Sequence, residues 1–397
     1  MQTFAKATMR LGTETAFEVL ARARALEAEG RHVVHLEIGE PDFDTPAHIV
    51  DAGVQALRGG FTHYGPSAGL PEVRAAIGAY AGGMRGIDIG PEEVVITPGG
   101  KPVMFFGMMA LLDPGDEVLY PNPGFPIYES VIRYLDAKPV PLRLDESRDF
   151  GLDVDELASR ITPRTRMLIL NTPANPTGGV IPRADIERVA ELALKHDFWI
   201  LSDEIYARIL YEGEHHSILS VPGMRARTLL LDGHSKTYAM TGWRLGFAVA
   251  PKPLADMISK FMTNCNSCTA SFTQMAGMAA VRGPQDAVLA MVAEFRARRD
   301  LIVDGLNAIG RIRCLRPKGA FYVFPNITGT GKTSAELSTL LLQEAGVATL
   351  AGTAFGPVGE GHLRLSYANS LENLNLAVDR IRDWVRSSKG APIPTGR

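Results

Sequence analysis

Residues 228–244 read TLLLDGHSKTYAMTGWR and join a short apolar run to a polar turn. The run Thr228–Leu231 has the length and composition of a strand that is buried on both faces of a sheet. Lys236 follows where this strand should end, and most residues from there to Arg244 are uncharged. A lysine with so few charged neighbours could lie along an apolar surface with its ammonium in water. It could also be held at the end of the strand for chemistry.

Short apolar runs of the same kind alternate with helical patterns along the chain. They occupy residues 94–97, 117–120, 167–170, 198–201, 228–231 and 245–250. This alternation predicts an α/β fold in which a mainly parallel sheet is covered by helices on both faces. A long helical pattern at 286–309 ends the alternation, and two further strands are expected at 321–324 and 362–366. The C-terminal part should therefore form a smaller α+β unit.

The length of 397 residues exceeds what one hydrophobic core of ordinary size organises, so two domains are expected. A helix is predicted over residues 13–29, before the sheet begins, and it should pack with the smaller unit. We therefore predict a large domain at 47–290 and a discontinuous small domain made of 1–46 and 291–397.

The composition points to small-molecule chemistry in the cytoplasm. A net charge of -3 and a pI near 6.3 give no basic surface for nucleic acid or anionic lipid. The most apolar window, Val103–Leu112, is shorter than the roughly 20 residues of a membrane-spanning helix. Residues 1–31 mix arginine with glutamate, which does not resemble a signal or transit peptide.

Three cysteines cannot form a disulfide framework and fit a reducing compartment. Cys265 and Cys268 have the spacing of a metal-binding or redox pair. A structural zinc site needs four ligands, and the sequence has no second pair of that kind. We interpret both as ordinary loop cysteines and expect no metal site.

Polar residues follow four of the predicted strands, and ligands in open α/β sheets bind outside the carboxyl ends of strands. These residues are Gly99, Gly100 and Lys101, then Asn175, then Asp203 and Tyr206, and finally Ser235 and Lys236. Each has a simpler interpretation, such as a turn for the glycines or a helix cap for Asp203. Their shared position at strand ends favours one common ligand.

Pyridoxal phosphate is a cofactor that requires this set of groups. A lysine among apolar walls is more readily deprotonated, and its free amine can then condense with an aldehyde. Asp203 can keep the ring nitrogen of the cofactor protonated. The turn at Gly99 and Gly100 and the helix after it can bind the phosphate, together with Ser235 and Arg244.

The ordered motifs resemble the class I pyridoxal-phosphate aminotransferases, close to the prokaryotic aspartate aminotransferase branch. The resemblance extends from about Leu11 to Trp384 and centres on SKTYAMTGWRLGF, NTPANPTG, SDEIY and GEPDFDTP. It makes Lys236 the Schiff-base lysine and catalytic residue, and Arg244 a phosphate-binding arginine. It implies a cofactor site of Gly99, Gly100, Lys101, Tyr64, Phe125, Asn175, Asp203, Tyr206, Ser235, Lys236 and Arg244.

For the substrate, the resemblance implies that Arg364 in HLRLSY binds the α-carboxylate, with help from Gly39 and Asn175. It also implies a homodimer with shared active sites, in which Tyr64 reaches the cofactor phosphate of the neighbouring subunit. The chain departs from some relatives at Gly233, where they carry a second phosphate-binding serine. In this branch Lys101 can read a distal carboxylate, although it could equally be a lysine at a helix start.

The expected reaction is a ping-pong transfer of an amino group from an L-amino acid to a 2-oxo acid, with aspartate and 2-oxoglutarate favoured. Lys236 would act as general base and acid. The alternatives are an aminotransferase for aromatic, alanine or other neutral amino acids, or a β-lyase of the same fold. A cofactor-sensing DNA-binding regulator is disfavoured because 38 residues precede Gly39. A Rossmann-type dehydrogenase is disfavoured because the turn after 94–97 lacks G-x-G-x-x-G.

Overall fold

The computed structural model describes residues 4–387, so the outermost ends of the predicted small domain, 1–3 and 388–397, lie outside the described residues. Within the described range the largest sheet has seven strands in the order β2-β8-β7-β6-β5-β3-β4. Their bounds are β2 Val94–Thr97, β3 Glu117–Asn122, β4 Lys138–Arg143, β5 Thr165–Asn171, β6 Trp199–Asp203, β7 Thr228–Gly233 and β8 Gly246–Val249. β8 runs antiparallel to both of its neighbours, and the other pairs are parallel. The prediction of a mainly parallel sheet is confirmed.

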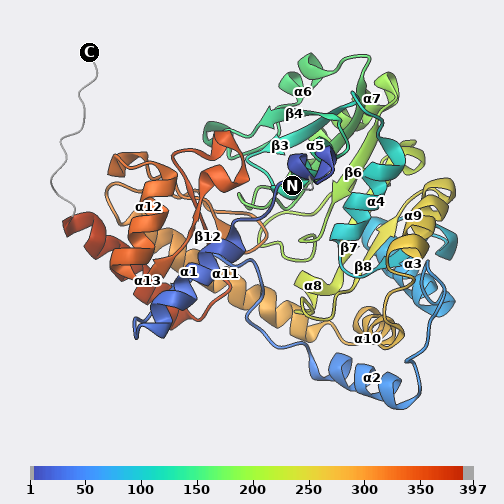
Figure 1. Cartoon of the computed structure of the whole chain (residues 1–397), viewed down its shortest axis with the longest axis horizontal. Coiled ribbons are helices and arrows are strands. Elements are labelled where there is room, and N and C mark those ends of the chain that lie inside the picture. The colour runs from blue at the N-terminus through green and yellow to red at the C-terminus, as the bar shows by residue number, and fades with distance from the viewer. Residues whose placement is uncertain (1–3, 388–397) are drawn as a thin grey trace.

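Helices cover both faces of this sheet (Figure 1). Alternate strand residues explain why, because Val95, Ile169 and Leu231 pack into one apolar cluster while Val94 and Leu230 pack into another on the opposite face. The first face is covered by α4 Lys101–Leu111, α5 Ile127–Tyr134 and α9 Lys252–Cys265. The opposite face is covered by α3 Pro71–Arg85, α6 Val154–Arg160, α7 Arg183–His196 and α10 Ser271–Arg282, with α2 Ala47–Arg58 packed on α10.

The edge strand β4 was absent from the sequence prediction. Its sequence KPVPLR contains two prolines, and Leu142 is its one buried residue. Proline cannot donate to a central strand ladder but is tolerated at the edge of a sheet. The prolines and the exposed residues explain why the sequence did not predict β4, which pairs on one side with β3.

The smaller unit is built around the long helix α11, Asp286–Asn307, close to the bounds predicted for it. Its sheets contain β9 Tyr322–Val323, β11 Leu350–Ala351 and β12 Leu363–Ser366 in one, and β1 Val34–His35 with β10 Val347–Ala348 in another. This unit also contains α12 Ser334–Leu340 and α13 Leu371–Ser387.

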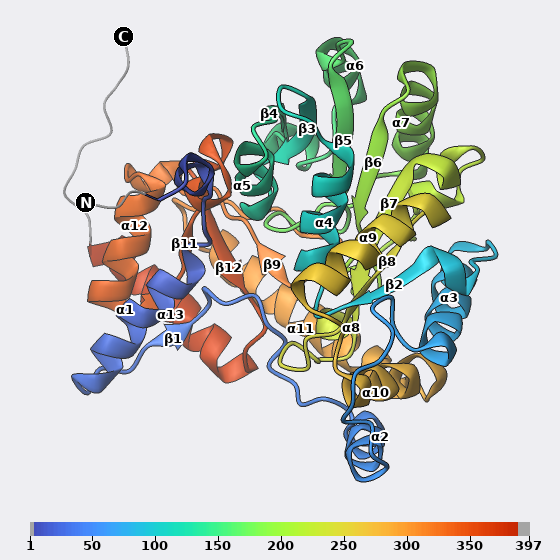
Figure 2. The ribbon, with the colours of Figure 1, turned by 45° about the vertical axis from the view of Figure 1, so that its right-hand side comes forward.

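The N-terminal helix α1, Ala16–Ala28, begins three residues later than predicted, after Thr15, whose side chain makes no capping bond. α1 lies among the C-terminal elements, as Figure 2 shows by its blue ribbon beside orange and red ones. Ala23 packs with Leu342 and Ala348 in one apolar cluster. The first and last parts of the chain therefore share a core.

Candidate active site

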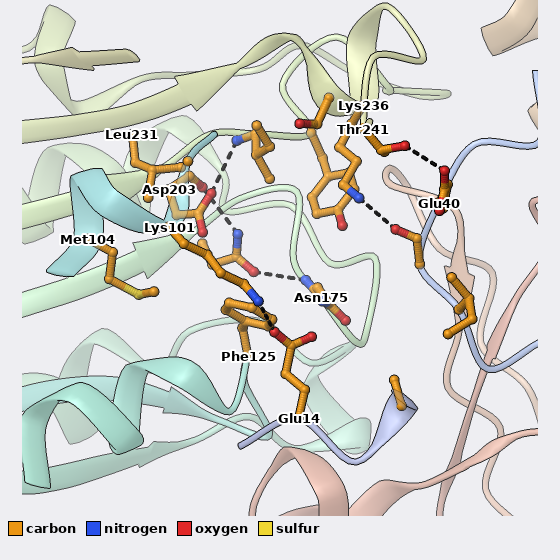
Figure 3. Close-up of a pocket in the computed structure, with 18 of the residues that line it drawn as sticks. Glu14, Glu40, Lys101, Met104, Phe125, Asn175, Asp203, Leu231, Lys236 and Thr241 are labelled. Atoms are coloured by element: carbon orange, nitrogen blue, oxygen red, sulfur yellow. Dashed lines mark hydrogen bonds and ion pairs between the residues drawn. The ribbon is translucent and has the colours of Figure 1, made fainter. Parts of the chain in front are cut away.

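A cavity of about 550 Å³ lies where the carboxyl ends of β5, β6 and β7 face the smaller unit. Figure 3 shows its lining side chains converging from elements that are far apart in sequence. The predicted residues that line it are Gly39, Gly100, Lys101, Phe125, Asn175, Asp203, Tyr206, Ser235, Lys236, Arg244 and Arg364. The volume is in the range of pockets that hold small-molecule cofactors.

Lys236 lies on α8, His234–Thr237, the short helix that follows β7. Its Nζ donates to the carbonyl oxygen of Gly39 at 2.6 Å. The pKa of the Lys236 ammonium is lowered to about 8, chiefly by burial; the charge of Glu40 opposes this lowering and the positive charge of Arg364 contributes to it. The free amine is therefore more available near neutral pH than that of an exposed lysine.

Asp203 is the last residue of β6 and is buried. Its Oδ2 accepts a hydrogen bond from the Tyr128 hydroxyl at 2.6 Å, and its Oδ1 accepts one from the Ile205 N–H at 3.2 Å. Burial raises the pKa of Asp203 to about 6, although both hydrogen bonds act in the opposite direction. A carboxylate held in this way favours a cationic N–H partner inside the cavity.

A buried charge cluster stands behind Asp203. The Nη2 atom of Arg85 lies 2.8 Å from Glu204 Oε2 and 3.3 Å from Asp232 Oδ2, and His215 Nε2 lies 2.7 Å from the same glutamate oxygen. Burial raises the pKa of Asp232 to about 6, against the lowering effect of Arg85. Three carboxyl groups thus share one end of the sheet, and Arg85 forms ion pairs with two of them, Glu204 and Asp232.

Asn175 and Tyr206 both line the cavity. The Asn175 N–H donates to Asn171 Oδ1 at 2.8 Å, which fixes the turn after β5. Among residues 4–387 no group bonds the buried Oδ1 of Asn175. The hydroxyl of Tyr206 lies 2.7 Å from that of Tyr322. Both side chains therefore present polar atoms to the space beside Lys236.

The residues around the start of α4 suit the binding of an anion. Gly99 has φ +92°, and a Cβ there would lie 2.4 Å from Arg244 Nη2. Gly100 lines the cavity and directly precedes α4. The N–H groups in the first turn of α4 have no partner within the helix and point toward its N-terminal end. Arg244, Ser235 and this helix start together suit a phosphate group.

Arg364 lies on β12 and is buried. One guanidinium nitrogen donates to the Glu37 carbonyl, and the guanidinium carbon lies 4.6 Å from the ring centroid of Tyr322. Its Nε has no partner among residues 4–387. Gly39 lies close to Tyr322, since a Cβ added at Gly39 would lie 2.1 Å from the Tyr322 hydroxyl. This arrangement suits a guanidinium that binds a carboxylate through two N–H groups.

Two predicted residues lie outside the cavity lining. Gly99 is covered by Arg244, and the side chain of Tyr64 is 89% exposed on the segment between α2 and α3. Lys101 lines the cavity, but its ammonium forms an ion pair with Glu14.

The sequence did not identify Tyr128, Asn171, Tyr322 or Glu14. Tyr128 follows Phe125 by three residues, and the centroids of the two rings lie 5.6 Å apart, so its closeness in sequence to Phe125 was the available signal. Asn171 ends β5 and donates to the Asp203 carbonyl oxygen at 3.2 Å. Its place at a strand end could have been used in the same way as that of Asp203.

The residues fit a planar aromatic aldehyde that carries a phosphate. The unpaired amide oxygen of Asn175 and the buried carboxylate of Asp203 are polar groups that such a ring could satisfy. The lack of a Cβ at Gly99 leaves room for Arg244 at the phosphate end.

Residues 4–387 contain no helix that is both long and apolar enough to cross a membrane. The three cysteines are free, with Cys265 exposed, Cys268 partly buried and Cys314 buried.

Comparison with known proteins gives consistent matches over most of the chain. The sequence model of "Aminotransferase class I and II" matches residues 31–381. An "Aspartate aminotransferase" of Pyrococcus abyssi is 43% identical over 90% of this chain and 93% of its own length. An "Aromatic-amino-acid aminotransferase 2" of Thermococcus litoralis is 42% identical over 90% of this chain and 92% of its own. The structure of aspartate aminotransferase from Thermus thermophilus with maleate superposes with a TM-score of 0.93, at 38% identity, covering 96% of this chain and 100% of that one.

Proposed function

The chain belongs to the class I and II aminotransferases, and from that premise we propose that it moves the amino group of L-aspartate to 2-oxoglutarate by a ping-pong mechanism. It is a pyridoxal-phosphate-dependent enzyme that transfers amino groups between amino acids and 2-oxo acids. The observation that supports its site best is the lowered pKa of Lys236 in the cavity that also contains Asp203 and Arg364.

The cofactor-binding roles follow from membership of the family and from the place of each residue in or beside the cavity. Asp203 would hold a proton on the ring nitrogen, Asn175 and Tyr206 would bind the ring hydroxyl oxygen, and Phe125 would pack on the ring. Ser235, Arg244, Gly99, Gly100 and the N–H of Lys101 would bind the phosphate. When bound, the cofactor withdraws electrons from the substrate carbon that loses its proton.

The substrate is oriented and deprotonated by residues of this chain. Arg364 binds the α-carboxylate through the nitrogens that the Glu37 carbonyl leaves free, and Gly39 and Asn175 complete that contact. The free amine of Lys236 then takes the proton from the α carbon of the amino donor. In the second half of the ping-pong cycle the same group gives a proton to the α carbon of the new amino acid. Its pKa of about 8 allows both steps near neutral pH.

The preference for aspartate is supported by relatives of that name and by Lys101 at the cavity wall. An aromatic or other neutral donor is the second candidate. It is favoured by the apolar side chains of Phe17, Met104 and Phe125 in the lining and by the Thermococcus litoralis relative.

The deciding experiment measures kcat/KM for a panel of amino donors with the holoenzyme, using 2-oxoglutarate or pyruvate as acceptor. We expect aspartate with 2-oxoglutarate to be the most efficient pair, and Lys236→Ala to abolish turnover. Preference for aromatic donors without aspartate activity would refute the donor assignment. Release of ammonia and pyruvate without any acceptor would identify a β-lyase instead, and normal turnover in Lys236→Ala would refute the site.

We further propose a homodimer in which Tyr64 reaches the cofactor phosphate of the second copy. The nearly complete exposure of the Tyr64 ring supports this role, and so do the exposed apolar residues Val50, Val54 and Leu57 on α2. We also propose that 47–290 form the large domain and that 1–46 with 291–397 form the small one. The three free cysteines support a reducing, cytoplasmic location.

A further inference from the structure

The ammonium of Lys101 is held by a carboxylate from a distant part of the chain. Lys101 is the first residue of α4, and its Nζ forms an ion pair with Glu14 Oε1. The same Nζ lies 5.8 Å from the ring centroid of Phe125. Figure 3 shows Lys101 and Glu14 pointing toward each other beside Phe125, and all three residues line the cavity.

The segment that carries Glu14 is fastened to α5. The Gly12 N–H donates to Ser130 Oγ at 2.9 Å, and that hydroxyl lies 3.2 Å from the Gly12 carbonyl oxygen. Arg10 Nε donates to the Arg133 carbonyl at 2.9 Å. The Glu14 side chain is 20% exposed, compared with 50% for Lys101. Glu14 is therefore a fixed part of the cavity wall.

The positive charges of the cavity show why this pair matters. Within residues 4–387 the cationic side chains of the lining are Lys101, Lys236, Arg244 and Arg364. Under the proposed function Arg244 binds phosphate, Arg364 binds the α-carboxylate, and Lys236 moves the proton. Lys101 is the cation that remains for the far end of a substrate, and Glu14 neutralises it.

We propose that Glu14 is a specificity-determining residue that sets the balance between acidic and neutral substrates. A dicarboxylic substrate must displace Glu14 from Lys101 before its distal carboxylate can pair with that ammonium. A substrate with an apolar side chain lies against Phe125 and Phe17 and leaves the ion pair intact. This inference rests on the proposed function, because it takes Lys101 as the group that faces the distal end of the substrate.

The test is ligand binding to the holoenzyme, which does not require turnover. Calorimetry gives Kd for maleate, a dicarboxylate, and for 3-phenylpropionate, an apolar monocarboxylate. We expect Glu14→Gln to tighten maleate binding about fivefold, as for release of a partly exposed ion pair, and to leave 3-phenylpropionate within about twofold. Glu14→Ala should shift the ratio of the two Kd values in the same direction. The matched control is Glu18→Gln on the exposed side of α1, which should change neither Kd.

The contribution of Lys101 is isolated in a Lys101→Gln background, where adding Glu14→Gln should improve maleate binding less than about twofold because no ammonium is released. An unchanged ratio in both Glu14 variants would overturn the inference, and so would a full fivefold gain in the Lys101→Gln background. The donor assignment fails separately, if the parent holoenzyme does not turn over aspartate. In that case the Kd ratios still decide the role of Glu14.

Discussion

Lys236 and Asp203 lie in one cavity, and burial displaces their pKa values in opposite directions. The pKa of the lysine falls to about 8 and that of the aspartate rises to about 6, so the protein without cofactor disfavours both charges. Such paired displacements are typical of catalytic sites. Their consequence is that these side chains cost stability in the free protein.

Asp203→Asn should stabilise the protein without cofactor at pH 7.5. The folded-state pKa of about 6 lies above the ordinary value of 3.8, so the penalty is full above pH 6, shrinks as pH falls and is absent below 3.8. The difference between these two pKa values corresponds to a destabilisation of the folded protein by at most about 3 kcal/mol. Denaturant unfolding at pH 7.5 and pH 4.5 measures it, and we expect most of the gain to be lost at pH 4.5.

The loaded Asp203→Asn enzyme should lose at least about a hundredfold in kcat, because the asparagine carries no charge to hold a proton on the ring nitrogen. Equal stability of the variant and the parent at pH 7.5 would contradict the assigned cost of burial. Unchanged kcat would contradict the assigned contact with the cofactor.

The sequence could predict Lys236 and Asp203 because each follows an apolar run, and residues that follow parallel strands meet at one edge of a sheet. It could not predict Tyr128, whose hydroxyl binds Asp203, because an aromatic residue on a buried helix face has the same pattern whether it packs or functions. Tyr322 and Glu14 come from other parts of the chain, and their meeting depends on how the units pack.

At the scale of elements, the reversed strand β8 shapes the phosphate cradle. Because β8 is antiparallel to β2, its first residue Gly246 pairs with Thr97, beside the turn that contains Gly99. A Cβ on Gly246 would lie 2.5 Å from the carbonyl carbon of Gly99. The predicted runs placed β2 and β8 in the sheet, but the direction of β8 depends on pairing, which an apolar run does not encode.

Gly246→Ala should therefore weaken cofactor binding by displacing the Gly99 turn. A Cβ at 2.5 Å from backbone atoms cannot be accommodated without movement of that turn. We expect the Kd for pyridoxal phosphate, measured by fluorescence titration, to rise at least about tenfold, as for loss of one charge-assisted hydrogen bond. Gly83→Ala on α3 is the control, since nothing lies within 4 Å of its added Cβ. Equal affinities in the two variants would refute the assigned cradle.

At the scale of the whole molecule, the cavity takes residues from both ends of the chain. Arg364 on β12 and Gly39 after β1 approach the ends of β5, β6 and β7. Tyr64 does not line this cavity, and its ring is exposed although its backbone is held on both sides. The His63 carbonyl accepts from Ser271 Oγ at 3.1 Å, and the Gly65 N–H lies 3.5 Å from Cys268 Sγ. A fixed backbone with an exposed ring is expected if Tyr64 serves a second copy.

Shared active sites predict that two impaired variants regain activity when they form a mixed dimer. In a mixed dimer of Lys236→Ala and Tyr64→Ala subunits, both defects fall in one site, and the other site has an intact Lys236 and an intact Tyr64 from its neighbour. Tyr64→Ala alone should raise the Kd for pyridoxal phosphate about tenfold, as for loss of a hydrogen bond to a charged group. The assay uses a cofactor concentration at which dimers of either single variant are mostly inactive. The mixed dimer should then show about half of the activity of the unsubstituted dimer, because one of two symmetric sites is intact. Mixed dimers purified through two different tags and assayed with amino donor provide the measurement.

If Tyr64 acted within its own subunit, each site of the mixed dimer would carry one defect, and no activity would be recovered. That outcome, or a monomer in solution at assay concentration, would overturn the proposed arrangement.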